Sequence, residues 1–398
     1  MTYVRSNLAD SKTLGWKRDI LESVKDLYVD LDKSLIPQTI SIQNLLVFPI
    51  SFGIPGEFIR STIPPKLKEF GRVVPGNSTT YFGQSQELFY RQDMSESLFA
   101  LTYKKLGWDC MRHLDIISSG CLPVFLDISK SPKGSLGLYP KKLLTLIGKS
   151  PGLMIEFKDT GDERGKTISN MKFDLSKLDK ELYYTVTAAL LHYNKQVLST
   201  SGVAKYFLHR VLENAKLTFG IQVPNFSKIL YLTHENKFMK AGDYQVDLLL
   251  HGLKSLLGDN VVDFPKRMVL YKTVNHFNKT SEYTPSRNQL YGFGFSFGLL
   301  LDQWTSVTPT DISTDVKENI VGKKYDLIVL GSGHRDIRWG NYVARIPFWA
   351  EVCTHTPSWK IALVDGGDFP LTSSIINRYA GCVGHFFSRE GADNGMLT

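Results

Sequence analysis

The second half of the chain carries short, nearly continuous apolar runs that alternate with a segment of helical spacing. The runs cover residues 228–233, 261–264, 324–330 and 359–365, whereas residues 244–257 have the 3.6-residue period of an amphipathic helix. Strands of a parallel sheet give continuous apolar runs because helices cover both faces of such a sheet. The order strand, helix, strand therefore predicts a doubly wound α/β domain.

The first half also predicts an α/β structure, although its pattern is less regular. Residues 44–54 form an apolar run that ends at a Pro-Gly turn, as a core strand would. Apolar residues recur at helical spacing over 176–218, with a break near Ser199, whose hydroxyl, or that of the next residue, can cap a second helix. We expect two Rossmann-like domains, residues 1–220 and residues 221–398.

The stretch 102–126 combines a loop, a short helix, a turn and a buried strand. Two lysines and a glycine precede Trp108. Asp109 can cap the start of the helix, and Gly120 can end it in the left-handed conformation. A helix N-terminus presents free amide groups, and lysines lie near this one, so the stretch is a candidate phosphate-binding site.

Four polar residues of this stretch are candidate donor-binding residues: Lys104, Lys105, Arg112 and Asp115. Arg112 and Asp115 are three positions apart, so they share one face of a helix. The arginine can hold a phosphate, and the aspartate can accept hydrogen bonds from ribose hydroxyls. The alternative is a solvated helix end with one surface ion pair.

The composition is that of an ordinary soluble globular protein. The chain has 398 residues, of which 42% are hydrophobic and 22% charged, and this length is enough for two or three domains. No apolar run approaches the roughly 18 residues of a membrane span, and the polar N-terminal residues predict no signal peptide. The cysteines 110, 121, 353 and 382 form no Cys-x-x-Cys pair, so we expect buried free thiols in a reducing cytoplasm.

The formal net charge of +8 indicates an anionic partner. Three kinds of partner fit: a nucleic acid, an anionic membrane surface and an anionic small substrate. The absence of an arginine-rich run and of an aromatic-basic repeat disfavours a nucleic-acid groove. A phosphorylated donor and a lipid-linked acceptor at a membrane surface fit at least as well, so the expected cytoplasmic location includes peripheral contact with the inner face of a membrane.

The sequence Gly331-Ser-Gly333 follows a predicted strand and begins like a dinucleotide-binding fingerprint. The third glycine of that fingerprint is missing, because Asp336 stands in its place. A strand-end loop that lines a cleft is therefore the favoured interpretation, with Ser332, His334 and Arg335 as its candidate residues. A nicotinamide or flavin oxidoreductase stays open as an alternative.

Asp243 and His276 are the candidate catalytic residues. Asp243 lies in the loop after the first strand of the second domain, where a carboxylate can act as nucleophile or general base. Because it directly precedes the helix predicted over 244–257, it can equally be a helix N-cap. A scattered histidine such as His276 is more often a surface or hydrogen-bonded residue than a catalyst. No spacing of ligand residues indicates a metal site, so no metal or cofactor is expected.

The stretch from Lys104 to Phe125 carries the pattern Lys-Lys-x-Gly-Trp-Asp-x-x-Arg-His-x-x-Ile-x-x-x-Gly-Cys-x-Pro-x-Phe. This pattern resembles the donor-site segment of exostosin-like and related bacterial and viral glycosyltransferases of the GT-B type. Weaker matches of the same kind lie at residues 49–55, 74–76, 139–143, 228–232, 243–244, 251–253, 325–332, 360–368 and 387–390.

The resemblance implies two Rossmann-like domains that bind a nucleotide-sugar donor without a required metal. The donor-like half comes first here, whereas it comes second in most GT-B enzymes, so the domain order looks circularly permuted. Rearranged order is a property of the bacterial retaining β-Kdo transferases of surface-polysaccharide synthesis, which use CMP-Kdo and an aspartate nucleophile. Asp243 matches that aspartate by its place in the fold.

The function that this resemblance implies is glycosyl transfer to a growing surface glycan, such as a lipopolysaccharide or O-antigen. The expected partners are a nucleotide-sugar donor, with CMP-Kdo first, and a glycan or lipid-linked glycan acceptor. A nucleoside-diphosphate hexose is the alternative donor, and a DNA-modifying glycosyltransferase is an alternative of the same chemistry. Linkage, anomeric outcome and oligomeric state stay open.

Overall fold

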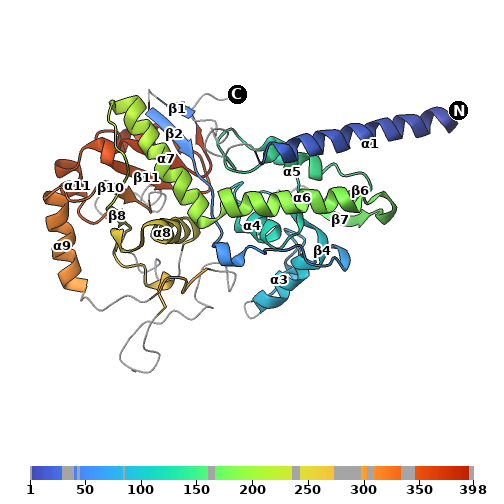
Figure 1. Cartoon of the computed structure of the whole chain (residues 1–398), viewed down its shortest axis with the longest axis horizontal. Helices are drawn as coiled ribbons and strands as arrows, with labels where there is room; N and C mark the ends of the chain where they lie inside the picture. The colour runs from blue at the N-terminus through green and yellow to red at the C-terminus, as the bar shows by residue number, and fades with distance from the viewer. Residues whose placement is uncertain are drawn as a thin grey trace, which may run out of the picture.

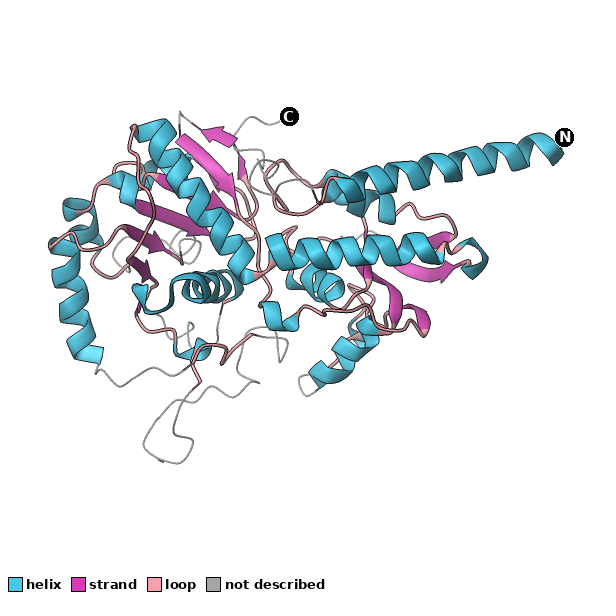
Figure 2. Cartoon of the chain, in the orientation of Figure 1, coloured by secondary structure: helices cyan, strands magenta, loops and turns pink. Residues whose placement is uncertain are grey.

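The computed structural model describes residues 2–28, 40–42, 45–83, 86–159, 166–234, 243–272, 297–302, 309–332 and 346–393. These residues form two lobes that lie side by side, and the helices α6 (Lys180–Tyr193) and α7 (Thr200–Phe219) run from one lobe to the other (Figure 1). Mostly parallel strands lie inside, with helices around them (Figure 2). The expected mixed α/β class is therefore confirmed.

The larger lobe contains a seven-stranded sheet in the order β1-β2-β13-β11-β10-β8-β9. Its strands are β1 (Ile40–Ile42), β2 (Leu45–Pro49), β8 (Ile229–Leu232), β9 (Val261–Phe264), β10 (Leu327–Leu330), β11 (Ile361–Asp365) and β13 (His385–Ser388). All neighbouring pairs are parallel except β1 with β2. β8, β9, β10 and β11 confirm the strands expected from the continuous apolar runs. Every residue of β13 is also buried, but this strand was not predicted.

Five of these strands have the spatial order of a doubly wound sheet. In chain order they are β8, β9, β10, β11 and β13, but they lie as β9-β8-β10-β11-β13, which is the order 2-1-3-4-5. In such sheets the connections reverse direction beside the first strand, and ligands bind in the crevice at the carboxyl ends of the strands there. The crevice position in this lobe is therefore the carboxyl edge of β8 and β10.

Helices cover this sheet, and a short two-stranded sheet lies beside it. They are α7, α8 (Tyr244–Leu257), α9 (Pro309–Val321), α11 (Trp349–His355) and α12 (Ser373–Tyr379), with the strands β12 (Leu371–Thr372) and β14 (Ala392–Asp393). α7 packs along α8, where the backbone of Thr200 touches the face of Gly252 so closely that no side chain fits. β1, β2 and α7 thus belong with the larger lobe, although the predicted boundary assigns them to residues 1–220.

The smaller lobe has a parallel sheet of three strands and an antiparallel hairpin. The sheet consists of β3 (Lys68–Phe70), β4 (Ser97–Thr102) and β5 (Leu122–Phe125), and the hairpin of β6 (Leu153–Asp159) and β7 (Lys166–Phe173). Its helices are α1 (Thr2–Lys25), α3 (Glu87–Ser95), α4 (Met111–Ser118), α5 (Lys141–Ile147) and α6. α1 extends away from the body in Figure 1, and its Trp16 Nε1 donates to the carbonyl oxygen of Leu146 at 2.8 Å.

The chain passes between the lobes at two adjacent points. The backbone N–H of Ile54 donates to the carbonyl of Leu198, and that of Thr200 donates to Ile54, both at 2.9 Å. An added Cβ at Gly53 would lie 2.8 Å from the Cα of Thr200, so the close approach requires a glycine. Ser199 Oγ accepts from an amide in the first turn of α7 at 3.0 Å, as the predicted cap does.

One hydrophobic cluster runs through both lobes. It includes Phe99 and Leu114 of the smaller lobe together with Tyr231 and Val329 of the larger lobe. A second cluster, which includes Phe386, covers the opposite face of the larger sheet. Because the lobes share buried apolar surface, the hydrophobic effect holds them together.

Two of the four cysteines form a disulfide. Cys353, on α11, and Cys382, before β13, are joined with their Cα atoms 5.2 Å apart, which corrects the expectation of free thiols for this pair. They lie 29 residues apart on different elements, and the fold rather than a sequence motif brings them together. Cys110 and Cys121 are free, as expected. Among the helices of the described ranges, none has the length and apolar character that crossing a membrane requires.

Candidate functional site

The helix predicted after Trp108 is present as α4, but its start differs from the prediction. Cys110 is the N-cap residue and makes no side-chain cap hydrogen bond. Asp109, the expected cap, instead accepts hydrogen bonds from the backbone N–H of Phe52 at 2.9 Å and from the hydroxyl of Tyr139 at 3.1 Å. The prediction of the Asp109 cap was therefore wrong, because tertiary contacts take both oxygens of this buried carboxylate.

A carboxylate of the larger lobe occupies the amide groups ahead of α4. Glu390 Oε2 accepts from the backbone N–H of Trp108 at 3.0 Å, and Oε1 accepts from that of Asp109 at 3.1 Å. Gly107 is required beside them, because an added Cβ would collide with Glu390 Oε1. These two amides, which precede the first turn of the helix, are therefore not free for a phosphate.

Arg389 joins the carboxyl ends of β11 and β13 to the same loop. Its Nε donates to the carbonyl of Gly366 and its Nη2 to that of Gly367, both at 3.0 Å, while Nη1 donates to the carbonyl of Asp109. The guanidinium carbon lies 4.6 Å from the centroid of the Phe52 ring. A planar guanidinium can donate to several carbonyls and stack on a ring at once, so Arg389, 2% exposed, is the centre of a buried polar junction.

Burial shifts the acids of this junction toward their neutral forms. Desolvation raises the pKa of Glu390 to about 7, although the charge of Arg389 and the two amides oppose the rise. Desolvation likewise raises the pKa of Asp109 to about 6, again against the charge of Arg389. Both carboxyl groups therefore titrate close to neutral pH.

Asp115 is buried against α3 rather than open to a ribose. Its Oδ2 accepts from the hydroxyl of Tyr90 at 3.2 Å, and its Oδ1 lies 3.8 Å from Nη1 of Arg91. The residue is 3% exposed, and desolvation raises its pKa to about 6. Its ion-pair partner is Arg91, which the sequence did not single out, and not the neighbouring Arg112 on the same helix.

Arg112 is the predicted phosphate ligand that has an unused donor. Its guanidinium carbon lies 5.8 Å from the ring centroid of Tyr81, and its buried Nη1 donates no hydrogen bond within the described ranges. A partly buried guanidinium with an unused N–H group favours an anionic ligand. Lys104 and Lys105 are exposed on the preceding loop, with Nζ of Lys104 at 5.5 Å from the ring centroid of Trp108.

Asp243 and Ser332 lie at the crevice position between β8 and β10. Asp243 is the N-cap of α8, because its Oδ1 accepts from two amides of the first turn at 3.1 and 3.2 Å, which confirms the capping interpretation. Ser332 Oγ accepts from the backbone N–H of His234 at 3.0 Å and so connects the loops that leave β10 and β8. The remaining candidates lie outside the described residues: His276, His334 and Arg335.

A row of aromatic and cationic contacts connects the N-terminus of α8 with α4. Tyr244, which follows Asp243, has its ring centroid 6.3 Å from that of Phe297. The guanidinium carbon of Arg91 lies 5.5 Å from the Phe297 ring, and the same guanidinium pairs with Asp115. These contacts connect the first turn of α8 with Asp115 of α4 through Phe297 and Arg91. Arg91 and Phe297 were missed because neither lies in a motif.

The glycine that begins the Gly-Ser-Gly sequence after β10 has a packing explanation. An added Cβ at Gly331 would collide with the ring of Tyr231 on β8. That ring is fixed, because the Tyr231 hydroxyl donates to the carbonyl of Val246 at 2.9 Å. A glycine is therefore needed here whether or not a dinucleotide binds.

Arg389 and Glu390 were not among the predicted site residues. Their signal in the sequence is a pair of opposite charges directly after the apolar run of β13. Because strand carboxyl ends in a doubly wound sheet face the crevice, such a pair is a candidate for the junction.

The described ranges contain no group of three or more His, Cys, Asp or Glu residues arranged to hold a metal ion. The comparisons of the chain with protein-family models, with curated proteins and with solved structures gave no match.

Proposed function

We propose that the chain is a nucleotide-sugar-dependent glycosyltransferase of the GT-B type, with two Rossmann-like domains in permuted order. CMP-Kdo is the first candidate donor and a nucleoside-diphosphate hexose the second. The acceptor is a surface glycan, such as a lipopolysaccharide or O-antigen, presented at the cytoplasmic face of a membrane. The resemblance of residues 104–125 to a donor-site segment supports this proposal.

The observation that carries the proposal is the unused Nη1 donor of Arg112 on α4. Asp243 comes from the other half of the chain, and a row of contacts leads from its neighbour Tyr244 through Phe297 to Arg91, the ion-pair partner of Asp115 on α4. GT-B chemistry needs a cation for the leaving phosphate on one lobe and acceptor-side groups on the other. Arg112 supplies an unused guanidinium donor on the smaller lobe, and Asp243 supplies a carboxylate at the crevice position of the larger lobe.

The proposed reaction proceeds with retention in two displacements. The Asp243 carboxylate bonds to the anomeric carbon while the bond to the nucleotide phosphate breaks, and the electron pair leaves with the phosphate. Arg112 stabilises the charge that develops on this phosphate. An acceptor hydroxyl then displaces Asp243 and gives its proton to a base, for which His276 is the candidate. The amides that bind Asp243 Oδ1 hold the carboxylate in one orientation.

Thermal shift with nucleotides tests the donor site. CMP should raise the melting temperature of the full chain more than UDP, GDP or NAD at equal concentration. Arg112→Gln should remove the shift, whereas Lys149→Gln, which removes one exposed charge elsewhere, should keep it. A shift with UDP or GDP alone would replace the CMP donor with a nucleoside-diphosphate sugar. A shift with NAD alone, or one that Arg112→Gln leaves intact, would overturn the assignment of this site.

Transfer itself is tested with radiolabelled CMP-Kdo and a lipid-linked glycan acceptor. Label should move to the acceptor in the presence of the full chain and without an added metal. Release of CMP without an acceptor product would indicate hydrolysis of the donor instead. The absence of any turnover with CMP-Kdo and with nucleoside-diphosphate hexoses would contradict the proposal.

A further inference from the structure

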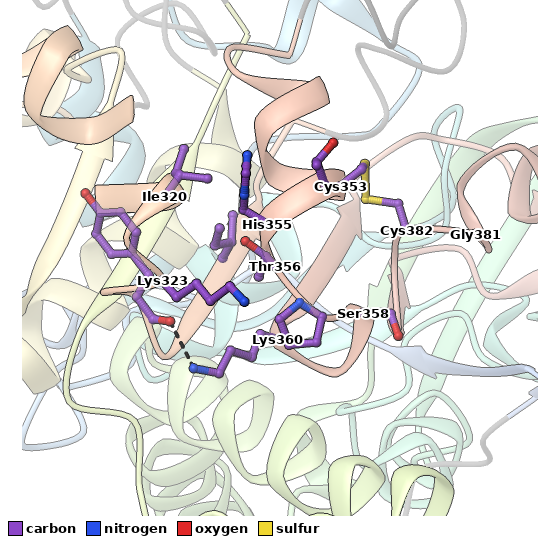
Figure 3. Close-up of a pocket in the computed structure, with 13 residues that line it drawn as sticks. Ile320, Lys323, Cys353, His355, Thr356, Ser358, Lys360, Gly381 and Cys382 are labelled. Atoms are coloured by element: carbon purple, nitrogen blue, oxygen red, sulfur yellow. Dashed lines mark hydrogen bonds between the residues drawn. A yellow bond between two sulfur atoms is a disulfide. The ribbon is translucent and has the colours of Figure 1, made fainter. Parts of the chain in front are cut away.

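A cavity of about 520 Å³ lies at the amino-terminal edge of the larger sheet, away from the junction of the lobes (Figure 3). Ile328, near the start of β10, and Lys360, which directly precedes β11, are among its lining residues. The ends of α9 and α11 and the turn before β13 supply the other walls. Its volume lies in the range of small-molecule sites.

The polar lining of this cavity is cationic. Lys323, His355 and Lys360 line it, and none of its lining residues is an aspartate or glutamate. In Figure 3 the Lys323 and Lys360 side chains extend into the same space. Lys360 Nζ donates to the carbonyl of Tyr325 at 3.2 Å, and the side chain of Lys323 makes no ion pair within the part of the chain that the structure describes.

Two acids on the elements around the cavity form ion pairs or hydrogen bonds with other groups. Glu351 of α11 forms an ion pair with Lys317 at 2.7 Å. Asp326 accepts hydrogen bonds from the backbone N–H groups of Ser227 and Lys228, both at 2.9 Å. Both carboxylates thus have partners outside the cavity, although the charge of Asp326 also acts on Lys360 and that of Glu351 on His355.

The remaining lining suits a ligand that has both an anionic group and an apolar part. Thr354, Thr356 and Ser358 are among the lining residues and carry hydroxyl groups, whereas Tyr325 and Pro357 add apolar surface. The Cys353–Cys382 disulfide forms part of the wall and ties α11 to the turn before β13. A covalent link across the rim keeps the cavity open in one shape, and a preformed cavity binds a ligand at a lower entropic cost.

The carboxyl ends of two helices offset part of the positive charge of this cavity. α9 ends at Val321 and α11 ends at His355, so the carbonyl ends of both helices lie near the cavity and favour nearby cations. Each helix end is equivalent to about half a negative charge, so the two together offset about one of the positive charges.

We propose that this cavity is a binding site for a small organic phosphate. The phosphate contacts the ammonium groups of Lys323 and Lys360. The hydroxyl groups of Thr356 and Ser358 donate hydrogen bonds to it, and the organic part lies against Tyr325 and Pro357. The site lies at the opposite edge of the sheet from the proposed donor site and does not depend on it.

Calorimetric titration with phenyl phosphate and with inorganic phosphate tests this site. The titration uses the full chain carrying Arg112→Gln, so that the candidate donor site does not contribute, and the ionic strength is held constant. Both probes should bind saturably, and phenyl phosphate should bind more tightly because its ring has apolar contacts. Adding Lys323→Gln should weaken binding about tenfold, the usual effect of losing one charge-assisted hydrogen bond.

Lys324→Gln is the matched control, since it removes the same charge at the next position from a side chain that does not line the cavity. It should change the dissociation constant less than about twofold, as expected for an exposed charge in salt. Equal weakening by the two substitutions would mean that net charge alone attracts the phosphate, and would overturn the proposal. The absence of saturable binding, or binding that is present only when Arg112 is intact, would overturn it as well.

Discussion

Glu390 accepts a hydrogen bond from the backbone N–H of Trp108, 282 positions earlier in the chain. A side chain at the carboxyl end of the larger sheet is thereby bonded to the loop that precedes α4 in the smaller lobe. Arg389, its neighbour, donates to the same loop through the carbonyl of Asp109. The two lobes are therefore held together by directional bonds as well as by apolar packing, and this arrangement can be tested.

Removing the Glu390 carboxylate should destabilise the whole chain. Glu390→Ala leaves two backbone amides without an acceptor and removes one of the two carboxylates that pair with Arg389, the other being Asp368. The loss of one member of a buried pair costs about 3 kcal/mol. The free energy of unfolding from urea denaturation measures the effect. Glu318→Ala, at an exposed position of α9, should change it by less than about 0.5 kcal/mol. Equally small effects of both substitutions would mean that the junction contributes nothing to stability.

The contribution of Glu390 to the stability of the protein should fall as the pH rises toward neutrality. The pKa of Glu390 is raised by burial from 4.5 to about 7, so the folded state binds more protons than the unfolded state over this window. Asp109, with its pKa raised to about 6, acts in the same direction. Glu390→Gln should therefore remove this contribution, so that the stability of the variant falls less, or rises more, than that of the parent chain, by on the order of 3 kcal/mol across the window at most. Urea denaturation between pH 5 and pH 8 measures the slope, and an unchanged slope in the variant would contradict the assignment.

Two substitutions at Asp243 should separate its capping role from a catalytic role. Asparagine caps a helix about as well as aspartate, so Asp243→Asn should keep the free energy of unfolding within about 0.5 kcal/mol. Asp243→Ala should lose about 1 kcal/mol with the cap. Both variants should lose glycosyl transfer, because an amide and a methyl group are not nucleophiles. Full transfer by Asp243→Asn would remove this residue from the mechanism and leave it as a cap.

Gly331→Ala should destabilise the larger lobe. The new methyl group would overlap the ring of Tyr231, which its hydrogen bond to Val246 holds in place, and overpacking of this kind costs about 2 kcal/mol. Gly15→Ala is the contrasting change, because it meets no atom within 4 Å and lies inside α1, where alanine should stabilise the helix by about 0.5 to 1 kcal/mol. Thermal denaturation compares the two, and equal melting temperatures would show that Tyr231 moves aside.

The elements of the larger lobe could be predicted because their signals are local. The apolar runs of β8, β10 and β11 identify buried strands without knowledge of their neighbours, and Asp243 caps the helix that directly follows it. The break at Ser199 is local in the same sense. For each of these, the interactions that decide the structure lie within a few residues of one another.

The contacts of the site could not be predicted, because they join distant segments. Asp109 has the spacing of a helix cap, but the amide of Phe52 and the hydroxyl of Tyr139 compete for its carboxylate and only the fold places them there. Likewise Arg112 and Asp115 have the spacing of an ion pair, yet Arg91 from α3 takes the aspartate. In both cases the carboxylate interacts with residues from other elements instead of with the nearby groups on its own helix.

The pairing of β2 with β13 has a consequence for the order in which the protein can fold. Val47 lies opposite Phe386 in the parallel ladder, so β2 emerges from the ribosome long before its partner strand is made. At the usual elongation rates of about 10 residues per second, this delay is about half a minute. During that time an apolar strand lacks its neighbour on the sheet and is exposed to aggregation. Completion of the larger sheet is therefore a late event in synthesis, and premature termination before β13 would leave a nascent chain that depends on chaperones.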